Sequence, residues 1–218
     1  MSTLASVFRS SIGKKILMSL TGLFLCSYLV IHLAGNLLLL KPDSGAGFDQ
    51  YAELLPSLTI IKIIEYGLYA VFLLHMISGT VLWFQNRAAR PQKYAANHPE
   101  ANSSFFSRTM FLTGSIIFIF LVIHMKQFWV NSRFTTEEHF SMYRAVTDVF
   151  SNGYYDVFYL IAMGLLAFHL RHGFQSAFQT FGLKATKLSG LIEAIGVIFW
   201  LVIPVGFAII PVYFFLKS

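Results

Sequence analysis

Five long apolar stretches constrain the fold of this chain more than any other feature of its sequence. They lie at about residues 16–40, 60–84, 108–130, 156–180 and 189–215. Each is long enough to cross a hydrocarbon core about 30 Å thick, which needs roughly 20 helical residues. Because charged residues make up only 12% of the chain, a soluble fold would leave too much apolar surface in water. The sequence therefore predicts an all-α membrane protein, with a single transmembrane domain covering residues 1–218.

Composition and motifs exclude several other classes of protein. With 56% hydrophobic residues, the chain is neither disordered nor a nucleic-acid-binding domain, despite an isoelectric point near 9.5. Its single cysteine, Cys26, cannot close a disulfide within the chain. The first apolar stretch is too long for a signal-peptide core, so we expect it to remain as a helix. In the fifth stretch, Pro204 and Pro211 predict kinks, because proline removes a backbone donor.

Basic residues predict how the five spans are oriented. If the N-terminus is cytoplasmic, that side holds ten of the Lys and Arg residues and the other side holds six. The acidic residues divide the opposite way, with two inside and eight outside. Because cytoplasmic loops carry an excess of Lys and Arg, we expect the N-terminus inside and the C-terminus outside.

Four of the seven histidines fall inside spans, one on each of the first four: His32, His75, His124 and His169. Ionisable residues within a span are costly and usually functional. At about 1.5 Å of rise per residue, His32 and His124 lie roughly 9–12 Å from the outer ends of their helices. By the same measure, His75 and His169 lie roughly 13–14 Å from the inner ends. One pair therefore shares an outer level of a four-helix bundle, and the other pair shares an inner level.

Two imidazoles that face each other across a helix bundle are suited to hold a planar haem iron. His75 and His169 are each followed four residues later by a glycine, Gly79 and Gly173, which would let a porphyrin approach the backbone. Because no C-x-x-C-H sequence is present for covalent attachment, the pattern predicts two non-covalent haems with histidine at both axial positions. Separate roles as interhelical hydrogen-bond donors are the alternative.

Three further residues near these histidines are candidates for the site. His172 is an alternative ligand to His169, but it is one turn closer to the inner end and has no glycine four residues on. Arg171, His172 and Lys126 are placed to pair with haem propionates near the interfaces. Arg171 and Lys126 are equally consistent with side chains that extend to the membrane surface.

The residues around these motifs resemble a known family. The stretches that carry the resemblance are residues 10–15 (SSIGKK), 20–22 (LTG), 32–36 (HLAGN) and 168–179 (FHLRHGFQSAFQ). They are similar to the dihaem cytochrome b anchor subunits of succinate dehydrogenases and fumarate reductases. The likeness covers essentially the whole chain and is greatest to the single-polypeptide anchor known in bacteria as the cytochrome b558 subunit.

The resemblance implies a cofactor set and partners. His75 and His169 would ligate the haem b nearer the cytoplasm, and His32 and His124 the haem b nearer the outside. A flavoprotein subunit and an iron–sulfur subunit would dock on the cytoplasmic face of a bacterial cytoplasmic (inner) membrane. The chain itself would perform no succinate chemistry. It would be an electron-transfer subunit that serves the respiratory chain and the tricarboxylic acid cycle, with menaquinone or ubiquinone as the membrane substrate.

Two acidic residues, and one difference from the family pattern, concern how protons would move. In the family, a quinone site can lie near the outer haem with an acidic proton acceptor, and Glu53 and Glu65 are the nearest candidates here. Both are also consistent with solvated charges. Some dihaem fumarate reductases carry a glutamate two residues before the fourth ligand. This chain has Ala167 there, which puts a proton path through that position in doubt.

Two other functions fit the same pattern of spans and histidines. A dihaem b subunit of another quinone-linked dehydrogenase, such as a hydrogenase or a formate dehydrogenase, would need the same ligands. A membrane transporter without haem could use the histidines as a proton relay.

Overall fold

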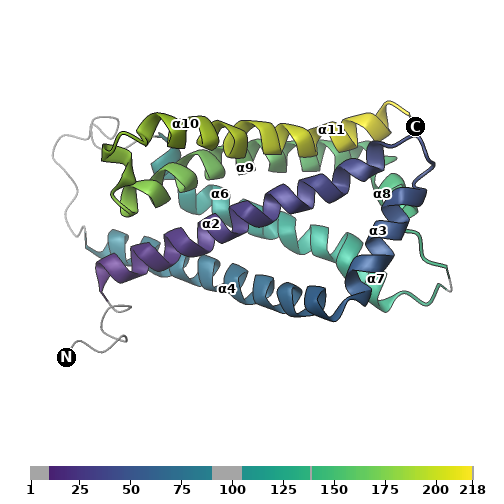
Figure 1. Ribbon diagram of the computed structural model, residues 1–218, viewed down its shortest axis with the longest axis horizontal. Coiled ribbons are helices and arrows are strands. Elements are labelled where there is room, and N and C mark those ends of the chain that lie inside the picture. Colours follow the sequence, from purple (N-terminus) through teal and green to yellow (C-terminus); the bar gives the residue numbers. More distant parts are fainter. Residues whose placement is uncertain (1–9, 90–104, 138, 218) are drawn as a thin grey trace.

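The computed structural model describes residues 10–89, 105–137 and 139–217, and in these residues the secondary structure is entirely helical (Figure 1). The α-helices that make up most of the five apolar segments are α2 (Ser11–Asn36), α4 (Thr59–Ala88), α6 (Phe105–His124), α9 (Gly153–Thr180), α10 (Ser189–Val197) and α11 (Ile203–Phe215). The other elements are η1 (Leu37–Leu40), α3 (Ala46–Ser57), η2 (Met125–Val130), α7 (Asn131–Phe134), α8 (Met142–Phe150), η3 (Leu183–Ala185) and η4 (Ile198–Val202).

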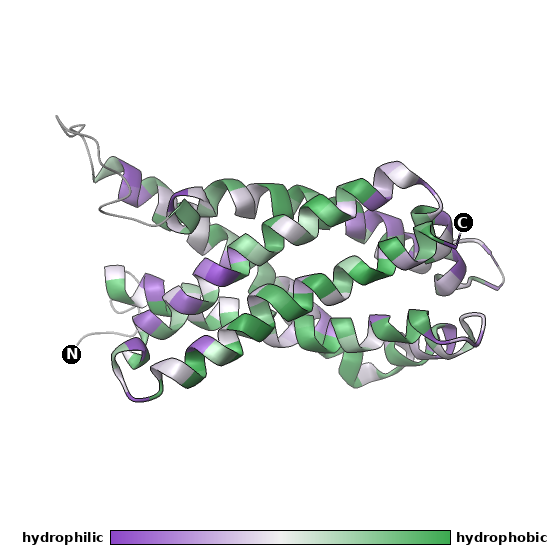
Figure 2. Ribbon diagram, turned by 90° about the horizontal axis from the view of Figure 1, so that it is seen from above, coloured by the Kyte–Doolittle hydropathy of each residue, from purple (hydrophilic) through white to green (hydrophobic). Residues whose placement is uncertain are grey.

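Five helical segments are long and apolar enough to cross a membrane, which confirms the predicted number of spans. They are Ser11–Leu40, Thr59–Ala88, Phe105–Phe134, Gly153–Thr180 and Ser189–Phe215. Hydrophobic residues dominate their middle parts, and hydrophilic residues gather at both ends of the molecule (Figure 2). The first span begins earlier than predicted because the Ser10 side chain caps the helix, accepting a hydrogen bond of 2.9 Å from the backbone N–H of Gly13.

The first four spans pack side by side, and the fifth covers one flank. Helix α2 packs against α4 and α9, and α6 packs against α9. The fifth span, formed by α10, η4 and α11, lies along α9 and also touches α2. This arrangement brings the four histidine-bearing helices together.

The end at which the chain terminates is closed by two short helices that the sequence patterns did not predict. Helices α3 and α8 lie at that end (Figure 1). The Asp49 carboxylate on α3 joins them, because it accepts hydrogen bonds from the Ser141 hydroxyl (2.6 Å) and the Tyr143 backbone N–H (2.7 Å). Gly45 precedes α3 with a φ of +88° and packs directly against the Tyr143 ring, so a side chain at this position would be excluded.

Two spans contain π-helical segments. Segment η2 begins directly after His124, and segment η4 occupies Ile198–Val202, just before Pro204. Proline cannot donate to the turn before it, and the helix widens at that turn. Pro211 lies inside α11. A π segment is often found at a functional site, and η2 starts at one of the predicted ligands.

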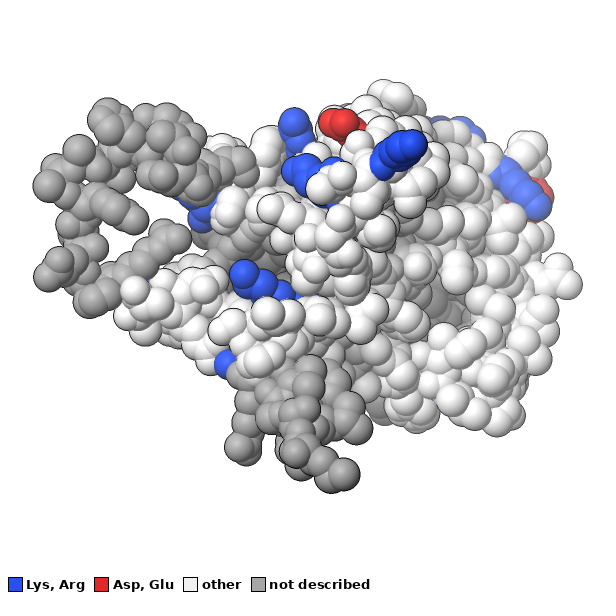
Figure 3. Space-filling model, turned by 60° about the vertical axis from the view of Figure 1, so that its left-hand side comes forward, with Lys and Arg blue, Asp and Glu red and all other residues white. Residues whose placement is uncertain are grey.

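Basic residues gather at the end where α2 begins, and few acidic residues are visible there (Figure 3). Helix α2 begins at this end and α11 finishes at the opposite end (Figure 1). We call the first the inner end and the second the outer end, as the positive charge predicts.

Candidate functional site

The four histidines of the spans form two pairs. The ring centres of His32 on α2 and His124 on α6 are 5.9 Å apart, with an angle of 86° between the ring planes. Those of His75 on α4 and His169 on α9 are 6.5 Å apart, with an angle of 68°. These are the same pairs that the helical rise placed at a common depth. Thr21, which contacts His75, precedes His32 by eleven residues on α2, so roughly 16 Å separates the two levels.

The spacing within each pair fits a metal ion placed between two imidazoles. Two metal–imidazole bonds of about 2 Å each, plus the distance from each nitrogen to its ring centre, put the ring centres roughly 6 Å apart. A bare ion would need further protein ligands. In the described part of the chain, no group of three or more His, Cys, Asp or Glu side chains gathers in this way. Two histidines alone could hold an iron whose remaining ligands come from a macrocycle.

At the inner level, a threonine hydroxyl from the neighbouring helix contacts Nδ1 of each histidine. The Thr21 Oγ1 lies 3.1 Å from Nδ1 of His75, and the Thr113 Oγ1 lies 3.4 Å from Nδ1 of His169. Each hydroxyl donates its own hydrogen to a backbone carbonyl of its helix. With its hydrogen on the carbonyl, the hydroxyl oxygen accepts from the ring, and this matches the tautomer that has its hydrogen on Nδ1 and a free Nε2 lone pair.

At the outer level, the two histidines are held in different ways. The Tyr159 hydroxyl donates to Oε1 of Gln127 (2.7 Å) and lies 3.2 Å from Nδ1 of His124. It therefore accepts from this ring as the threonines do at the inner level. Among the described residues, the hydrogen-bond partners of the His32 ring are on its own helix: Tyr28 and Asn36, at 3.4 and 3.5 Å from Nδ1. The Asn36 amide nitrogen can only donate to Nδ1, so this ring is not held as the other three are.

The glycines near the inner pair have distinct surroundings. Gly22 and Gly114 lie against the histidine rings, since an added Cβ would be 3.1 Å from Cε1 of His75 and 3.3 Å from Cε1 of His169, respectively. A Cβ on Gly173 would meet nothing within 4 Å. A Cβ on Gly79 would lie 3.2 Å from the end of Met18 on α2, so this glycine serves helix packing in the described structure.

The other residues proposed from the sequence lie outside the two pairs. His172 is half-buried, but it makes no ring contact with His75 among the described residues, whereas His169 does. The Arg171 guanidinium lies 4.4 Å from the ring centre of Phe106 and 5.1 Å from that of Trp200. It is thus held between two aromatic rings near the inner end. Lys126 is exposed on η2.

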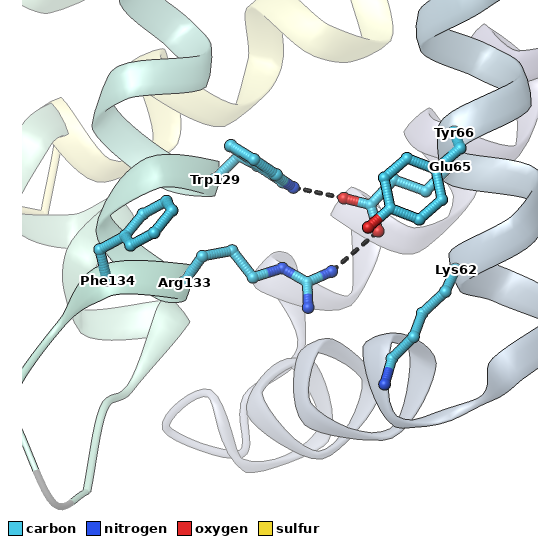
Figure 4. Close-up of a pocket in the computed structure, with 6 residues that line it drawn as sticks. All are labelled: Lys62, Glu65, Tyr66, Trp129, Arg133 and Phe134. Atoms are coloured by element: carbon cyan, nitrogen blue, oxygen red, sulfur yellow. Dashed lines mark hydrogen bonds and ion pairs between the residues drawn. The ribbon is translucent and has the colours of Figure 1, made fainter.

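Glu65 lies in a pocket of about 350 Å³ near the outer end, lined by residues of α4, η2 and α7 (Figure 4). The residues that line it are Lys62, Glu65, Tyr66, Trp129, Arg133 and Phe134. The Glu65 carboxylate accepts hydrogen bonds from Arg133 (2.8 Å), from the Tyr69 hydroxyl (3.0 Å) and from the Trp129 indole. Glu53, the other acidic candidate, is exposed on α3 and does not line this pocket.

Two buried polar groups near the outer level lack partners among the described residues. They are the Gln127 side-chain Nε2 and both carboxylate oxygens of Asp156. Gln127 already accepts from Tyr159, so its free donor lies close to His124. A buried donor without a partner is unfavourable, and a haem propionate would be a suitable acceptor for it.

The threonine and glycine contacts were not predicted from the sequence, although a signal for them is present. Residues 20–22 (Leu-Thr-Gly) and 29–32 (Leu-Val-Ile-His) recur with the same spacing at 112–114 and 121–124. Such internal similarity indicates a repeated structural unit. In the structure, the helix pair α2 and α4 and the helix pair α6 and α9 contain equivalent contacts between threonine, glycine and histidine.

Comparison of the chain with models of protein families, with curated proteins and with solved structures finds no match. The function is therefore inferred from the residues and geometry of this chain.

Proposed function

We propose that the chain is the dihaem cytochrome b subunit of a succinate dehydrogenase or fumarate reductase, and its membrane anchor. The observation that carries the proposal is the pairing of four histidines at two levels, with ring centres 5.9 and 6.5 Å apart. His32 and His124 would hold the outer haem b, and His75 and His169 the inner one. The haems would supply two one-electron carriers at different depths in the membrane.

The chain's own residues hold and orient the ligands. Thr21, Thr113 and Tyr159 lie within hydrogen-bond distance of Nδ1 of three of the four rings, and by accepting from Nδ1 they would leave Nε2 of each ring free to bind the iron. The remaining ring, His32, packs 5.5 Å from Phe207 of α11, so the fifth span supports the outer pair. Membrane burial of these rings excludes water and keeps competing ligands away from the iron.

The Glu65 pocket is the proposed quinone site. Trp129 and Arg133 follow His124 by five and nine residues, so the pocket lies roughly 8–14 Å beyond the outer histidines. Its volume of about 350 Å³ falls at the lower end of the range for small-molecule sites, about 300–1,000 Å³. The aromatic rings suit a quinone ring, and Glu65 supplies a carboxylate that can exchange a proton with it.

Partners follow from the resemblance and from charge. A flavoprotein and an iron–sulfur subunit would dock on the inner end, and the basic residues gathered there (Figure 3) would contribute to the contact. The location would be the bacterial inner membrane. Succinate oxidation or fumarate reduction would take place in the flavoprotein, and this chain would exchange electrons with quinone.

The test is the haem content of the purified chain and of single variants. We expect two haems b per chain, and one after replacement of any one of the four histidines by alanine. His75→Ala and His169→Ala should remove the same haem, and His32→Ala and His124→Ala the other. His139→Ala, at an exposed histidine outside the spans, is the control and should keep both haems.

Other results would redirect or end the proposal. Retention of two haems in all four variants would show that the pairing is wrong. A colourless protein with no reduced-minus-oxidised band would favour a transporter that lacks haem. Co-purification with nickel or molybdenum subunits, in place of a covalent flavin subunit, would favour a hydrogenase or a formate dehydrogenase.

A further inference from the structure

The two inner histidines occupy equivalent positions in the molecule. Thr21 and Gly22 of α2 contact His75, and Thr113 and Gly114 of α6 contact His169. Both Thr-Gly pairs belong to the repeated segments at 20–32 and 112–124. Equivalent contacts from two helices far apart in the sequence indicate a shared role rather than accidental packing.

We propose that these two Thr-Gly pairs are positioning elements that fix the tautomer and the ring orientation of the inner histidines, and so set the midpoint potential of the inner haem. The inference rests on the proposed function, since it concerns ligands of a haem. It assigns no ligand beyond the histidines already named.

The threonines select the tautomer because their hydroxyls are already committed as donors. Thr21 Oγ1 lies 2.8 Å from the Leu17 carbonyl and 3.1 Å from the Met18 carbonyl. Thr113 Oγ1 lies 3.1 Å from the Met110 carbonyl. When the hydroxyl hydrogen goes to one of these carbonyls, the hydroxyl oxygen accepts from the ring, and the ring then carries its hydrogen on Nδ1. Both threonines are buried, so water does not compete for these contacts.

The glycines set how closely each ring approaches the neighbouring helix. A Cβ on Gly22 would come within 3.1 Å of Cε1 of His75, and one on Gly114 within 3.3 Å of Cε1 of His169. Ordinary contacts of a Cβ are longer, so an alanine would push the ring away from its threonine. The glycine and the threonine together therefore hold the ring in one orientation.

A hydrogen bond accepted from Nδ1–H increases the electron donation of the imidazole to iron. Stronger donation favours the ferric state over the ferrous state. Loss of the acceptor should therefore raise the midpoint potential of the inner haem and leave the outer haem unchanged, because Tyr159 and not a threonine accepts from His124.

The experiment is redox titration of the purified full chain carrying Thr21→Val or Thr113→Val. Valine keeps the shape of threonine and removes the hydroxyl. Thr109→Val is the matched control, since Thr109 also lies on α6 and also donates to carbonyls of its own helix. The two potentials are assigned with His32→Ala, which should retain only the inner haem.

We expect the midpoint potential of the inner haem to rise in each valine variant and to rise further in the double variant. Thr21→Ser and Thr113→Ser should restore the original potential. Loss of the inner haem alone would also support positioning. A shift no greater than that of Thr109→Val, or an equal shift of both haems, would overturn the inference while leaving the proposed function intact.

A second pair of variants covers the case in which the valine proteins do not accumulate. Gly22→Ala and Gly114→Ala should weaken retention of the inner haem only. Two haems with unchanged potentials in both alanine variants would overturn the inference. If the unmodified chain binds no haem, the proposed function fails first and the inference fails with it.

Discussion

Glu65 accepts hydrogen bonds from three donors that belong to two of the five spans. Tyr69 lies on its own helix, and Trp129 and Arg133 come from η2 and α7. The π segment that begins after His124 shifts the phase of the following residues. A change in helix phase at this point affects which side chains face α4, where Glu65 lies.

Replacement of Glu65 by glutamine should separate haem binding from quinone chemistry. Glutamine has nearly the same shape and can still accept from Trp129, so we expect two haems and a normal fold. Loss of the carboxylate should lower quinone-dependent turnover by about 10²-fold or more, as for removal of an acid–base group. Glu53→Gln, on the exposed side of α3, is the control. Equal turnover in the Glu65→Gln and Glu53→Gln variants would show that Glu65 takes no part in quinone chemistry.

Asp156 is a buried acidic residue, and neither of its carboxylate oxygens has a hydrogen-bond partner among the described residues. It lies in the first turn of α9, where the helix dipole favours a negative charge but supplies no hydrogen-bond partner to the carboxylate. An unpaired buried carboxylate destabilises a fold. The residue is therefore expected to limit the stability of the outer end.

Asp156→Asn should stabilise the protein, since an amide loses less than a carboxylate when it is buried. We expect an increase of about 1–3 kcal/mol in the free energy of unfolding, the usual scale for an unsatisfied buried group. Thermal unfolding in detergent measures the change, and Asp148→Asn at an exposed position of α8 is the control. A less stable Asp156→Asn protein would indicate that the carboxylate has a partner or a function.

At the level of elements, the connections at the outer end contain helices that the apolar pattern did not predict. Residues 41–59, between the first two apolar stretches, contain α3, and residues 131–155, between the third and fourth, contain α7 and α8. Hydrophobic residues of η1, α3, α8, α9 and α11 meet there in one buried cluster: Leu39, Phe48, Val146, Phe150, Tyr159, Ile210 and Phe214. The cluster includes Tyr159, so the packing of these short helices affects a residue that holds His124.

Asp49→Ala should release α3 from α8. The carboxylate accepts two hydrogen bonds from α8 and its N-cap residue, and hydrogen bonds to a charged group contribute about 1.5–3 kcal/mol each. We expect faster hydrogen exchange across Ala46–Ser57 with both haems retained. Asp148→Ala, which removes an exposed carboxylate of helix α8, should leave exchange in α3 unchanged. If α3 is protected equally in both variants, Asp49 does not join the two helices.

At the scale of the whole molecule, local patterns predicted the spans but not their detailed contacts. Hydropathy and helical rise depend only on neighbours in the sequence, and they located five spans and the two levels of histidines. The short helices α3 and α8 lack long apolar runs, so they were not predicted. The contacts of Thr21 and Thr113 join residues more than fifty positions apart. Such contacts depend on how helices pack, and only the internal repeat pointed to them.

Sidedness is the remaining property of the whole molecule, and it determines which end the soluble subunits would reach. The excess of Lys and Arg at the inner end predicts that this end is cytoplasmic. Thr136 and Ala185 are exposed residues at the outer and inner ends, respectively, and the single native cysteine, Cys26, is buried. A cysteine can therefore be introduced at either position, and Cys26 does not have to be replaced first.

A membrane-impermeant maleimide should label Thr136→Cys in intact cells or right-side-out vesicles, and should label Ala185→Cys only after the membrane is opened. The unmodified chain should remain unlabelled in both conditions, because the buried Cys26 thiol is shielded from the reagent. The opposite labelling pattern would place the basic end outside. The Glu65 pocket would then face the cytoplasm, and an assembly in which soluble dehydrogenase subunits and the quinone site occupy opposite ends would be excluded.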